Sequence, residues 1–236
     1  MKDYEIMLKD KLEQAQIVVS DAALEKFRIY AEQLIEWNKK MNLTAIDDYW
    51  GIYEKHFLDS VLPMKDIDFK GKLLDVGAGA GFPSIPILIV NDKIEVTIVE
   101  PLGKRCNFLS EVVKCLSLSN ITIINERAED YIKTKREYFD IVTARAVANL
   151  TLLSELCIPY VKLNGIFVAL KSAQGNEEYE TASKAINILG CELTNKYEYD
   201  LNDAKRINLV FTKVKKTPIM YPRSFAKIKK EPLGVK

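Results

Sequence analysis

The sequence predicts an α/β protein with a doubly wound, mostly parallel sheet, an antiparallel last strand and an N-terminal helical extension. Three observations predict this fold. From Lys72 onward, short apolar runs alternate with helical patterns, which is typical of parallel strands joined by helices. A turn with three glycines separates the first apolar run from the next helix. The last two apolar runs, 192–199 and 207–214, have no helix between them, so they are expected to form an antiparallel hairpin.

Composition excludes several classes of protein. Hydrophobic residues make up 48% of the chain and charged residues 28%, as in ordinary soluble domains. No run of 18 apolar residues occurs, and residues 1–16 have no apolar signal region. Four cysteines without a CxxC pair and a single histidine argue against a disulfide framework and a metal site. We expect a cytoplasmic protein with no membrane partner and no metal.

Residues 1–68 are predicted to form the helical extension. Helical patterns cover 4–15, then about 21–38 behind a Ser20 or Asp21 cap, and then a stretch ending near Ser60. These helices have too few apolar faces for an independent core. We therefore expect the extension to pack on the main domain.

The main domain is expected to span 69–214, with strands and helices in alternation. The predicted strands are 73–76, 95–99, 121–124, 139–143, 165–170, 192–199 and 207–214, and the predicted helices are 82–90, 104–116, 149–160 and 176–189. Residues 215–236 form a basic tail that three prolines mark as irregular. Its charge fits a nucleic-acid contact and, equally, a solvated lysine segment.

Four features follow the carboxyl ends of successive predicted strands, where ligands bind to open parallel sheets. They are the glycine turn, then Glu100, then Ala128-Glu129 behind Arg127, and finally Arg145. Glu100 lies 23 residues after Gly77, at a spacing that lets a carboxylate accept hydrogen bonds from ribose hydroxyls. These features predict a cofactor that contains a nucleoside. The alternatives are a turn without a ligand and a surface carboxylate.

The glycine turn separates the candidate cofactors. It reads Gly77-x-Gly79-x-Gly81 behind Asp75, whereas the dinucleotide fingerprint is GxGxxG. With the acidic residue after the second strand and the reversed last strand, this turn resembles class I S-adenosylmethionine-dependent methyltransferases, which have a Rossmann-like sheet. The resemblance implies S-adenosyl-L-methionine as the cofactor.

Further motifs extend the resemblance to nearly the whole chain. In order they are Trp37-Asn38-Lys39-Lys40-Met41-Asn42-Leu43-Thr44, His56-Phe57-Leu58-Asp59-Ser60, Gly81-Phe82-Pro83, Arg127-Ala128-Glu129, Thr143-Ala144-Arg145-Ala146-Val147-Ala148 and Tyr221-Pro222-Arg223. Together they resemble the ribosomal RNA small subunit methyltransferase G family, also called glucose-inhibited division protein B. That family methylates N7 of one guanine in 16S ribosomal RNA. The lysine-rich tail after Arg223 departs from the family pattern.

The resemblance implies which residues line the cofactor site. They are Gly77, Phe82, Ala128, Glu129 and Arg145, to which the glycine turn and the ribose argument add Gly79, Gly81 and Glu100. Arg145 is expected to hold the cofactor carboxylate or to orient the guanine. The structural alternatives are a helix-start carboxylate for Glu129 and a surface ion pair for Arg145.

Missing motifs bear on the mechanism. No Asn-Pro-Pro-aromatic block follows the fourth strand, which disfavours methylation of an exocyclic amine. No Pro-Cys pair occurs to supply a nucleophile for a pyrimidine ring. Both absences suit guanine N7, whose lone pair is already free. We therefore expect direct in-line transfer without a general base, with His56 a disfavoured candidate for such a base.

Polar and basic residues outside the cofactor turn are candidates for substrate contacts. Asn42 and Asp59, with Asn38 and His56, are predicted to form a rim over the cofactor that reads the guanine edge or the RNA backbone, with helix capping and buried hydrogen bonding as the alternative. The predicted RNA-binding residues are Lys39, Lys40, Lys104, Arg105, Lys171 and Arg223, together with the tail. For Lys104 and Arg105 the alternative is that they cap the cofactor pocket. The expected partner is 16S ribosomal RNA, in the small ribosomal subunit or an assembly intermediate, and we expect a monomer.

Three other functions stay open at this point. One is a methyltransferase for a small molecule or a protein, which the basic tail and the motif blocks disfavour. Another is a nicotinamide-dependent oxidoreductase, which the GxGxG turn and the reversed hairpin disfavour. The last is a noncatalytic nucleoside-binding or ribosome-assembly factor. Binding assays with S-adenosylmethionine and with NAD distinguish a methyltransferase from an oxidoreductase. A turnover assay distinguishes an enzyme from a noncatalytic factor.

Overall fold

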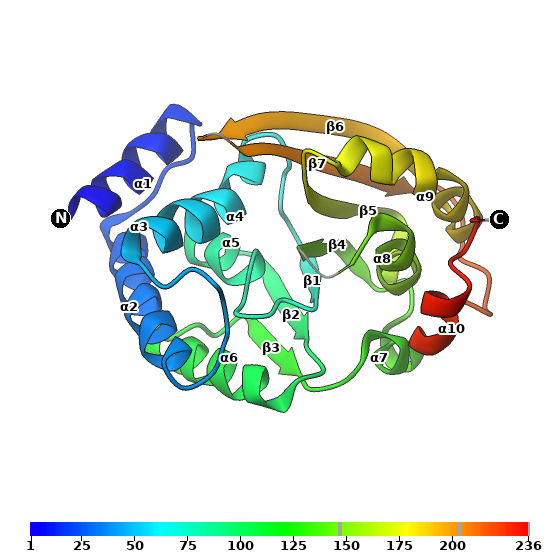
Figure 1. Ribbon diagram of the computed structural model, residues 1–236, viewed down its shortest axis with the longest axis horizontal. Coiled ribbons are helices and arrows are strands. Elements are labelled where there is room, and N and C mark those ends of the chain that lie inside the picture. Colours follow the sequence, from blue (N-terminus) through cyan, green and yellow to red (C-terminus); the bar gives the residue numbers. More distant parts are fainter. Residues whose placement is uncertain (146–147, 203, 236) are drawn as a thin grey trace.

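A computed structural model describes residues 1–145, 148–202 and 204–235 (Figure 1). Ala146 and Val147 of the block after the fourth strand lie outside the described residues, as do Asp203 and Lys236. One seven-stranded sheet crosses the molecule, with strand order β3-β2-β1-β4-β5-β7-β6. Its strands are β1 (Lys72–Val76), β2 (Glu95–Val99), β3 (Ile121–Ile124), β4 (Phe139–Arg145), β5 (Val161–Ser172), β6 (Cys191–Leu201) and β7 (Ala204–Lys213).

The pairing of the strands confirms the predicted fold class. Strands β1 to β5 pair in parallel, and β7 pairs antiparallel with both β5 and β6. The chain runs outward from β1 through β2 to β3 and then returns to β4 on the other side of β1. This reversal between β1 and β4 opens a crevice at the carboxyl ends of the strands, which is the usual ligand position in such sheets.

Helices and helical turns lie on both faces of the sheet (Figure 1). In chain order they are α1 (Asp3–Gln14), α2 (Asp21–Asn38), α3 (Tyr49–Gly51), the π-helical turn η1 (Ile52–Leu58), α4 (Asp59–Val61), the 3₁₀ turn η2 (Leu62–Lys65), α5 (Ser84–Val90), α6 (Gly103–Cys115), α7 (Ala128–Lys135), α8 (Leu150–Cys157), the 3₁₀ turn η3 (Ile158–Tyr160), α9 (Gly175–Leu189) and α10 (Phe225–Lys230). Ser20, one of the two predicted caps of the second helix, accepts from the Ala23 amide, and Asp48 caps α3 by accepting from the Gly51 amide. Helices α7 and α10 are additions to the elements that the sequence predicted.

The helical extension shares a core with one face of the sheet. Phe27, Tyr30 and Phe57 are fully buried in the same cluster as Leu73 of β1 and Ile141 of β4. Because successive strand residues face opposite sides, the neighbours of these strand residues enter a second core under α8 and α9. The extension thereby holds η1 beside the carboxyl ends of β1 and β4.

The C-terminal segment also packs on the molecule. Ile228 of α10 is fully buried in the second core, and Arg223 pairs with Glu155 of α8 at 2.7 Å. This differs from the irregular tail expected from the prolines, because a short helix with one buried apolar residue gives little periodic signal. Among the residues that the structure describes, no helix has the length and apolar character needed to cross a membrane.

Candidate functional site

The three glycines of the turn after β1 all have positive φ, from +62° to +97°, but they serve different ends. A Cβ added to Gly79 meets nothing within 4 Å, so this glycine faces open space. A Cβ on Gly81 would come 2.5 Å from the Tyr30 hydroxyl and 2.6 Å from Ile85. Gly79 thus leaves room for a ligand, whereas Gly81 lets the turn pack under the helical extension.

An open cavity of about 910 Å³ lies at the carboxyl ends of β1, β2, β3 and β4. Most of the predicted cofactor residues line it, namely Gly77, Gly79, Phe82, Glu100, Ala128, Glu129 and Arg145. Arg105, predicted to contact RNA, lines the same cavity. Gly81 lies behind the wall, against Tyr30. Their convergence in one cavity of this size fits a nucleoside-sized cofactor.

Glu100 is fixed at the middle of this cavity. It is only 1% exposed, and its two carboxylate oxygens accept from the Gly79 and Leu102 amides, each at 3.1 Å. Arg105 approaches the same carboxylate at 3.7 Å. The carboxylate is thus held rigidly beside the glycine turn.

Asp75 stabilises the glycine turn through a hydrogen bond across it. It is fully buried, and Oδ2 accepts from the Ser84 amide at 3.2 Å. Burial raises the pKa of Asp75 to about 7. The side chain therefore ties β1 to the start of α5 across the glycine turn.

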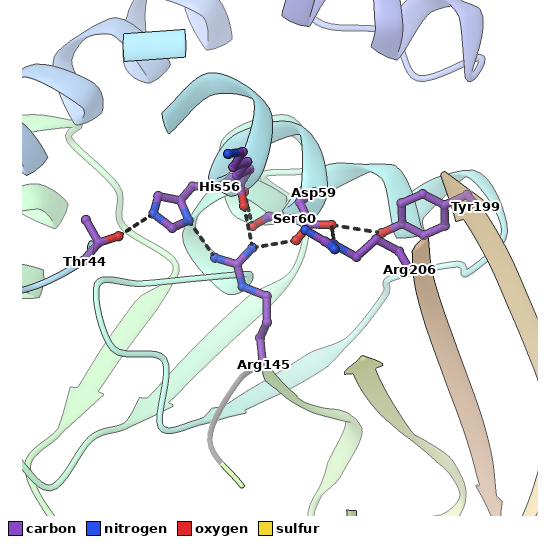
Figure 2. A network of polar contacts seen from close by, with 8 residues as sticks. Thr44, His56, Asp59, Ser60, Arg145, Tyr199 and Arg206 are labelled. Atoms are coloured by element: carbon purple, nitrogen blue, oxygen red, sulfur yellow. Dashed lines mark hydrogen bonds and ion pairs between the residues drawn. The ribbon is translucent and has the colours of Figure 1, made fainter. Parts of the chain in front are cut away.

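Arg145, at the end of β4, carries the contacts between the sheet and the helical extension (Figure 2). Its Nη1 donates to Asp59 Oδ2 at 3.2 Å and to the Lys55 carbonyl at 3.3 Å. The other Asp59 oxygen accepts from Arg206 Nε at 2.9 Å and from the Tyr199 hydroxyl at 3.4 Å. Asp59 thus holds two arginines that come from different strands.

His56 lies on the other side of Arg145. Its Nδ1 is 3.3 Å from Arg145 Nη2, and its Nε2 is 2.8 Å from the Thr44 hydroxyl. A guanidinium only donates, so Nδ1 accepts and Nε2 carries the proton. Burial, together with the charge of Arg145, lowers the pKa of His56 to about 3. A neutral imidazole of such low basicity, with both nitrogens engaged, is a poor general base.

A second cavity, of about 540 Å³, adjoins the first. His56 and Arg145 line both cavities, so the two cavities meet at these side chains. Lys55, Asp59, Lys171, Tyr199, Arg206 and Asn208 also line the second cavity. Its lining is polar and rich in cations.

The other predicted contact residues lie in varied settings. Asn42 is exposed and lines neither cavity, whereas Asp59 is buried between the two arginines. Lys39, Lys40 and Lys104 are exposed. Lys171 is only 8% exposed and pairs with Glu178, and Arg223 pairs with Glu155, so both have structural partners. An RNA contact for any of these residues stays a prediction.

Several residues of the site were not identified from the sequence. Tyr199, Arg206 and Asn208 come from the terminal hairpin, and Tyr30 comes from the middle of α2. Their contacts join positions up to 147 residues apart, so no local pattern marks them. Asn38, part of the first motif, holds the loop that follows α2. Its side chain accepts a hydrogen bond from the Leu43 amide and donates one to the Thr44 carbonyl.

Comparison with known protein sequences gives a full-length match. Residues 23–207 match the family described as rRNA small subunit methyltransferase G. Ribosomal RNA small subunit methyltransferase G of Staphylococcus epidermidis is 47% identical over 231 residues, covering 96% of this chain and 97% of that protein. The protein of the same name from Clostridium botulinum is 45% identical over 239 residues, covering 99% and 100%.

Solved structures with similar folds are much more distant in sequence. M. jannaschii TYW2 in complex with AdoMet has a TM-score of 0.55 and 15% identity, covering 72% of this chain and 80% of that one. A 16S rRNA (adenine(1408)-N(1))-methyltransferase from Catenulisporales acidiphilia, solved with SAM, has a TM-score of 0.51 and 12% identity, covering 62% and 86%. At such identity the likeness concerns the fold.

Proposed function

Because the chain belongs to the rRNA small subunit methyltransferase G family, we propose that it methylates N7 of one guanine in 16S ribosomal RNA with S-adenosylmethionine. Family membership makes it an S-adenosylmethionine-dependent methyltransferase of small-subunit ribosomal RNA. The observation that carries the finer proposal is the arrangement of two cavities that meet at Arg145 and His56. One has the features of a nucleoside-cofactor site, and the other is polar and open to solvent.

The residues of the first cavity fit S-adenosylmethionine. Glu100 would accept the two ribose hydroxyls, and the open space at Gly79 would admit the ligand against the backbone. Ala128 and Glu129, at the start of the helix α7 that follows β3, would lie along the adenine. The methionine half would then extend across β1 toward Phe82 and Arg145. When bound, the cofactor supplies a methyl group on a positively charged sulfur, which needs no further activation.

The chain's own contribution is then alignment. Guanine N7 has a free lone pair and loses no proton before it attacks, so no general base is required. The neutral, fully engaged His56 supports this interpretation. Holding two reactants in line supplies on the order of 7–11 kcal/mol in favourable cases. In this proposal Arg145, fixed by Asp59 and His56, positions the reacting groups at the junction of the cavities.

Contacts with RNA would come mainly from lysines around the rim. Exposed Lys39, Lys40 and Lys104 can neutralise phosphates, and Lys55 lies at the mouth of the second cavity. The substrate would be 16S ribosomal RNA within a small subunit or an assembly intermediate, which places the enzyme in the cytoplasm. We further propose that it acts as a monomer and without a metal ion.

The decisive test is methyl transfer from labelled S-adenosylmethionine to small subunits from a strain that lacks this protein, with the modified base mapped. We expect one N7-methylated guanine and a flat pH–rate profile near neutrality. Glu100→Ala should abolish cofactor binding, whereas Lys93→Ala, on an exposed loop away from both cavities, should behave like the wild type. Methyl transfer to another nucleobase would contradict the proposal. So would a pH–rate profile that reveals an essential general base on the protein titrating near pH 7.

A further inference from the structure

The second cavity is not needed to hold the proposed cofactor, which occupies the first cavity. Its volume of about 540 Å³ lies within the range of small-ligand pockets, about 300–1,000 Å³. It opens to solvent on the side of Lys55 and shares only Arg145 and His56 with the cofactor cavity. A group bound here therefore lies next to the cofactor cavity, at the junction that Arg145 and His56 border.

The lining of this cavity contains hydrogen-bond donors without partners. Arg206 makes one hydrogen bond, from Nε to Asp59, so its Nη1 and Nη2 groups have no partner within residues 1–145, 148–202 and 204–235. Asn208 is 1% exposed, and its Nδ2 is buried without a hydrogen bond to any described residue. Its amide lies close enough to the Tyr199 hydroxyl to lower the pKa of that group, against the larger raising effect of burial. The Asn208 amide is the buried group of the two, and an unpaired buried donor is costly unless a ligand satisfies it; Arg206 is partly exposed and keeps its Nη groups open to a ligand.

The two side chains lie on the same face of β7. Residues i and i+2 of a strand point to the same side, so Arg206 and Asn208 both face the cavity, while Ile207 enters the core on the opposite side. Asp59 fixes the Arg206 guanidinium through Nε and leaves the Nη edge free. The pair therefore forms a rigid row of donors on one wall.

We propose that Arg206 and Asn208 hold the acceptor base in this cavity by donating hydrogen bonds to O6 of guanine. The inference rests on the proposed transfer to guanine N7. Arginine has no acceptor, so it pairs with the keto oxygen of guanine and not with the amino group of adenine. A base held at O6 presents the adjacent N7 toward Arg145 and the cofactor cavity. Asp59, whose oxygens are already occupied, is then a positioning residue for both arginines.

The test is a double-mutant cycle in which O6 of the base and its proposed protein partners are removed separately and together. Small subunits are reconstituted with guanine or with 2-aminopurine, a purine that keeps N7 but lacks O6, at the target position. Methyl transfer is measured for the wild type, Arg206→Met and Asn208→Leu. For the wild type, loss of O6 should lower kcat/KM about tenfold to a hundredfold. For Arg206→Met and for Asn208→Leu the same loss should lower kcat/KM by a smaller factor than in the wild type, because one of the two proposed donors to O6 is already gone.

Two readouts separate recognition from damage to the fold. The affinity for S-adenosylmethionine and the Tm should change little in Asn208→Leu, which keeps the shape of the side chain. Lys205→Met is the matched control, because Lys205 lies on the same strand, is exposed and pairs with Glu198 away from this cavity. It should retain wild-type kcat/KM on both substrates.

The outcomes are distinct. If the wild type methylates guanine but both variants lose equal activity on guanine and 2-aminopurine, or lose none, the inference is wrong and the proposed function stands. If the wild type transfers no methyl group to small-subunit RNA, both the proposed function and the inference are wrong.

Discussion

The imidazole of His56 stacks on the ring of Phe82, with the ring centroids 4.5 Å apart and the planes 15° from parallel. Phe82 belongs to the glycine turn, and His56 belongs to η1 in the helical extension. Arg145 lies over the same Phe82 ring at 5.0 Å, and Tyr30 stacks on it at 5.5 Å. The extension therefore belongs to the proposed cofactor site, because it fixes the Phe82 ring that lines the cavity.

The buried histidine makes stability depend on pH. The pKa of His56 is lowered to about 3, whereas an unfolded histidine titrates near 6.5. As the pH falls below about 6.5 the unfolded chain takes up a proton that the folded chain refuses, so stability falls. From this residue alone, the free energy of unfolding should be about 1.4 kcal/mol lower at pH 5.5 than at pH 8. Urea denaturation at both pH values measures it.

The control for this prediction is His56→Gln, which keeps an amide in place of the ring but cannot titrate. Asp75 acts in the opposite direction, because its raised pKa of about 7 makes stability fall as pH rises from about 4 to 7. The wild type and His56→Gln both contain Asp75, so its effect cancels when the pH dependence of one is subtracted from that of the other. An identical pH dependence in wild type and His56→Gln would show that His56 is accessible to protons in the folded state.

Asp59 and Asn42, both predicted as substrate rim, should behave differently. Asp59 is buried and pairs with Arg145 and Arg206, so Asp59→Ala leaves two cations without their shared partner. Removing one member of a buried ion pair costs about 3–5 kcal/mol, which lowers the Tm by several degrees. Asn42 is exposed, and Asn42→Ala should change stability by less than about 0.5 kcal/mol.

Differential scanning calorimetry and S-adenosylmethionine titration check this pair. Loss of methyl transfer in Asn42→Ala with unchanged Tm and cofactor affinity would support its predicted contact with RNA. A stable, cofactor-binding Asp59→Ala would contradict the positioning role that the network gives Asp59.

Alanine substitutions at Gly79 and at Gly81 should also have different effects. Gly81→Ala places a Cβ against Tyr30 and Ile85 in the core, so it should destabilise the protein by about 1–3 kcal/mol or more. Gly79→Ala meets no protein atom and carries only the backbone cost of a positive φ, about 1 kcal/mol. Its methyl group points into open space beside Glu100, so it should weaken S-adenosylmethionine binding instead.

Calorimetric titration and thermal unfolding of both variants distinguish the two effects. If Gly79→Ala binds the cofactor as tightly as the wild type, the ligand does not approach this part of the turn. If Gly81→Ala keeps the wild-type Tm, the turn can shift away from Tyr30.

Local patterns were enough to predict the sheet and the cofactor turn. The apolar runs located all seven strands, and the missing crossover helix predicted the antiparallel hairpin. Glu100 was predicted from its spacing alone and lies in the cavity with the glycine turn. These features depend on neighbours in sequence, which is why periodicity reveals them.

The parts that were missed depend on distant contacts. The predicted third helix is broken into α3, η1 and α4, and the π-helical turn places His56 and Asp59 toward Arg145. Arg206 and Asn208 look like ordinary strand residues until β7 is known to lie beside β5. Helix α7 has only Tyr131 and Ile132 as large buried apolar residues, too few for a helical period.

The C-terminal tail combines a structural part with a charged part, and the two can be tested separately. Glu155 is fully buried and has Arg223 as its charged partner at 2.7 Å, so Arg223→Met should cost about 3–5 kcal/mol and lower the Tm on the order of 10 °C. Deleting 215–236 would also remove Ile228 and expose the part of the second core that it covers, so the deletion would report on folding as well as on RNA. A cleaner variant changes only exposed charges, since Lys227, Lys229 and Lys230 all face solvent.

The triple variant Lys227→Gln, Lys229→Gln and Lys230→Gln should keep the wild-type Tm, because none of these side chains is buried. If the tail contacts phosphates, each lost contact should lower the slope of log K against log salt by about 0.7–0.9. Affinity for small-subunit RNA measured between 50 and 200 mM salt, roughly the range over which such contacts weaken most visibly, gives that slope. An unchanged slope with an unchanged Tm would mean that the lysines of α10 are only a solvated surface. In that case α10 serves the fold alone, through Ile228.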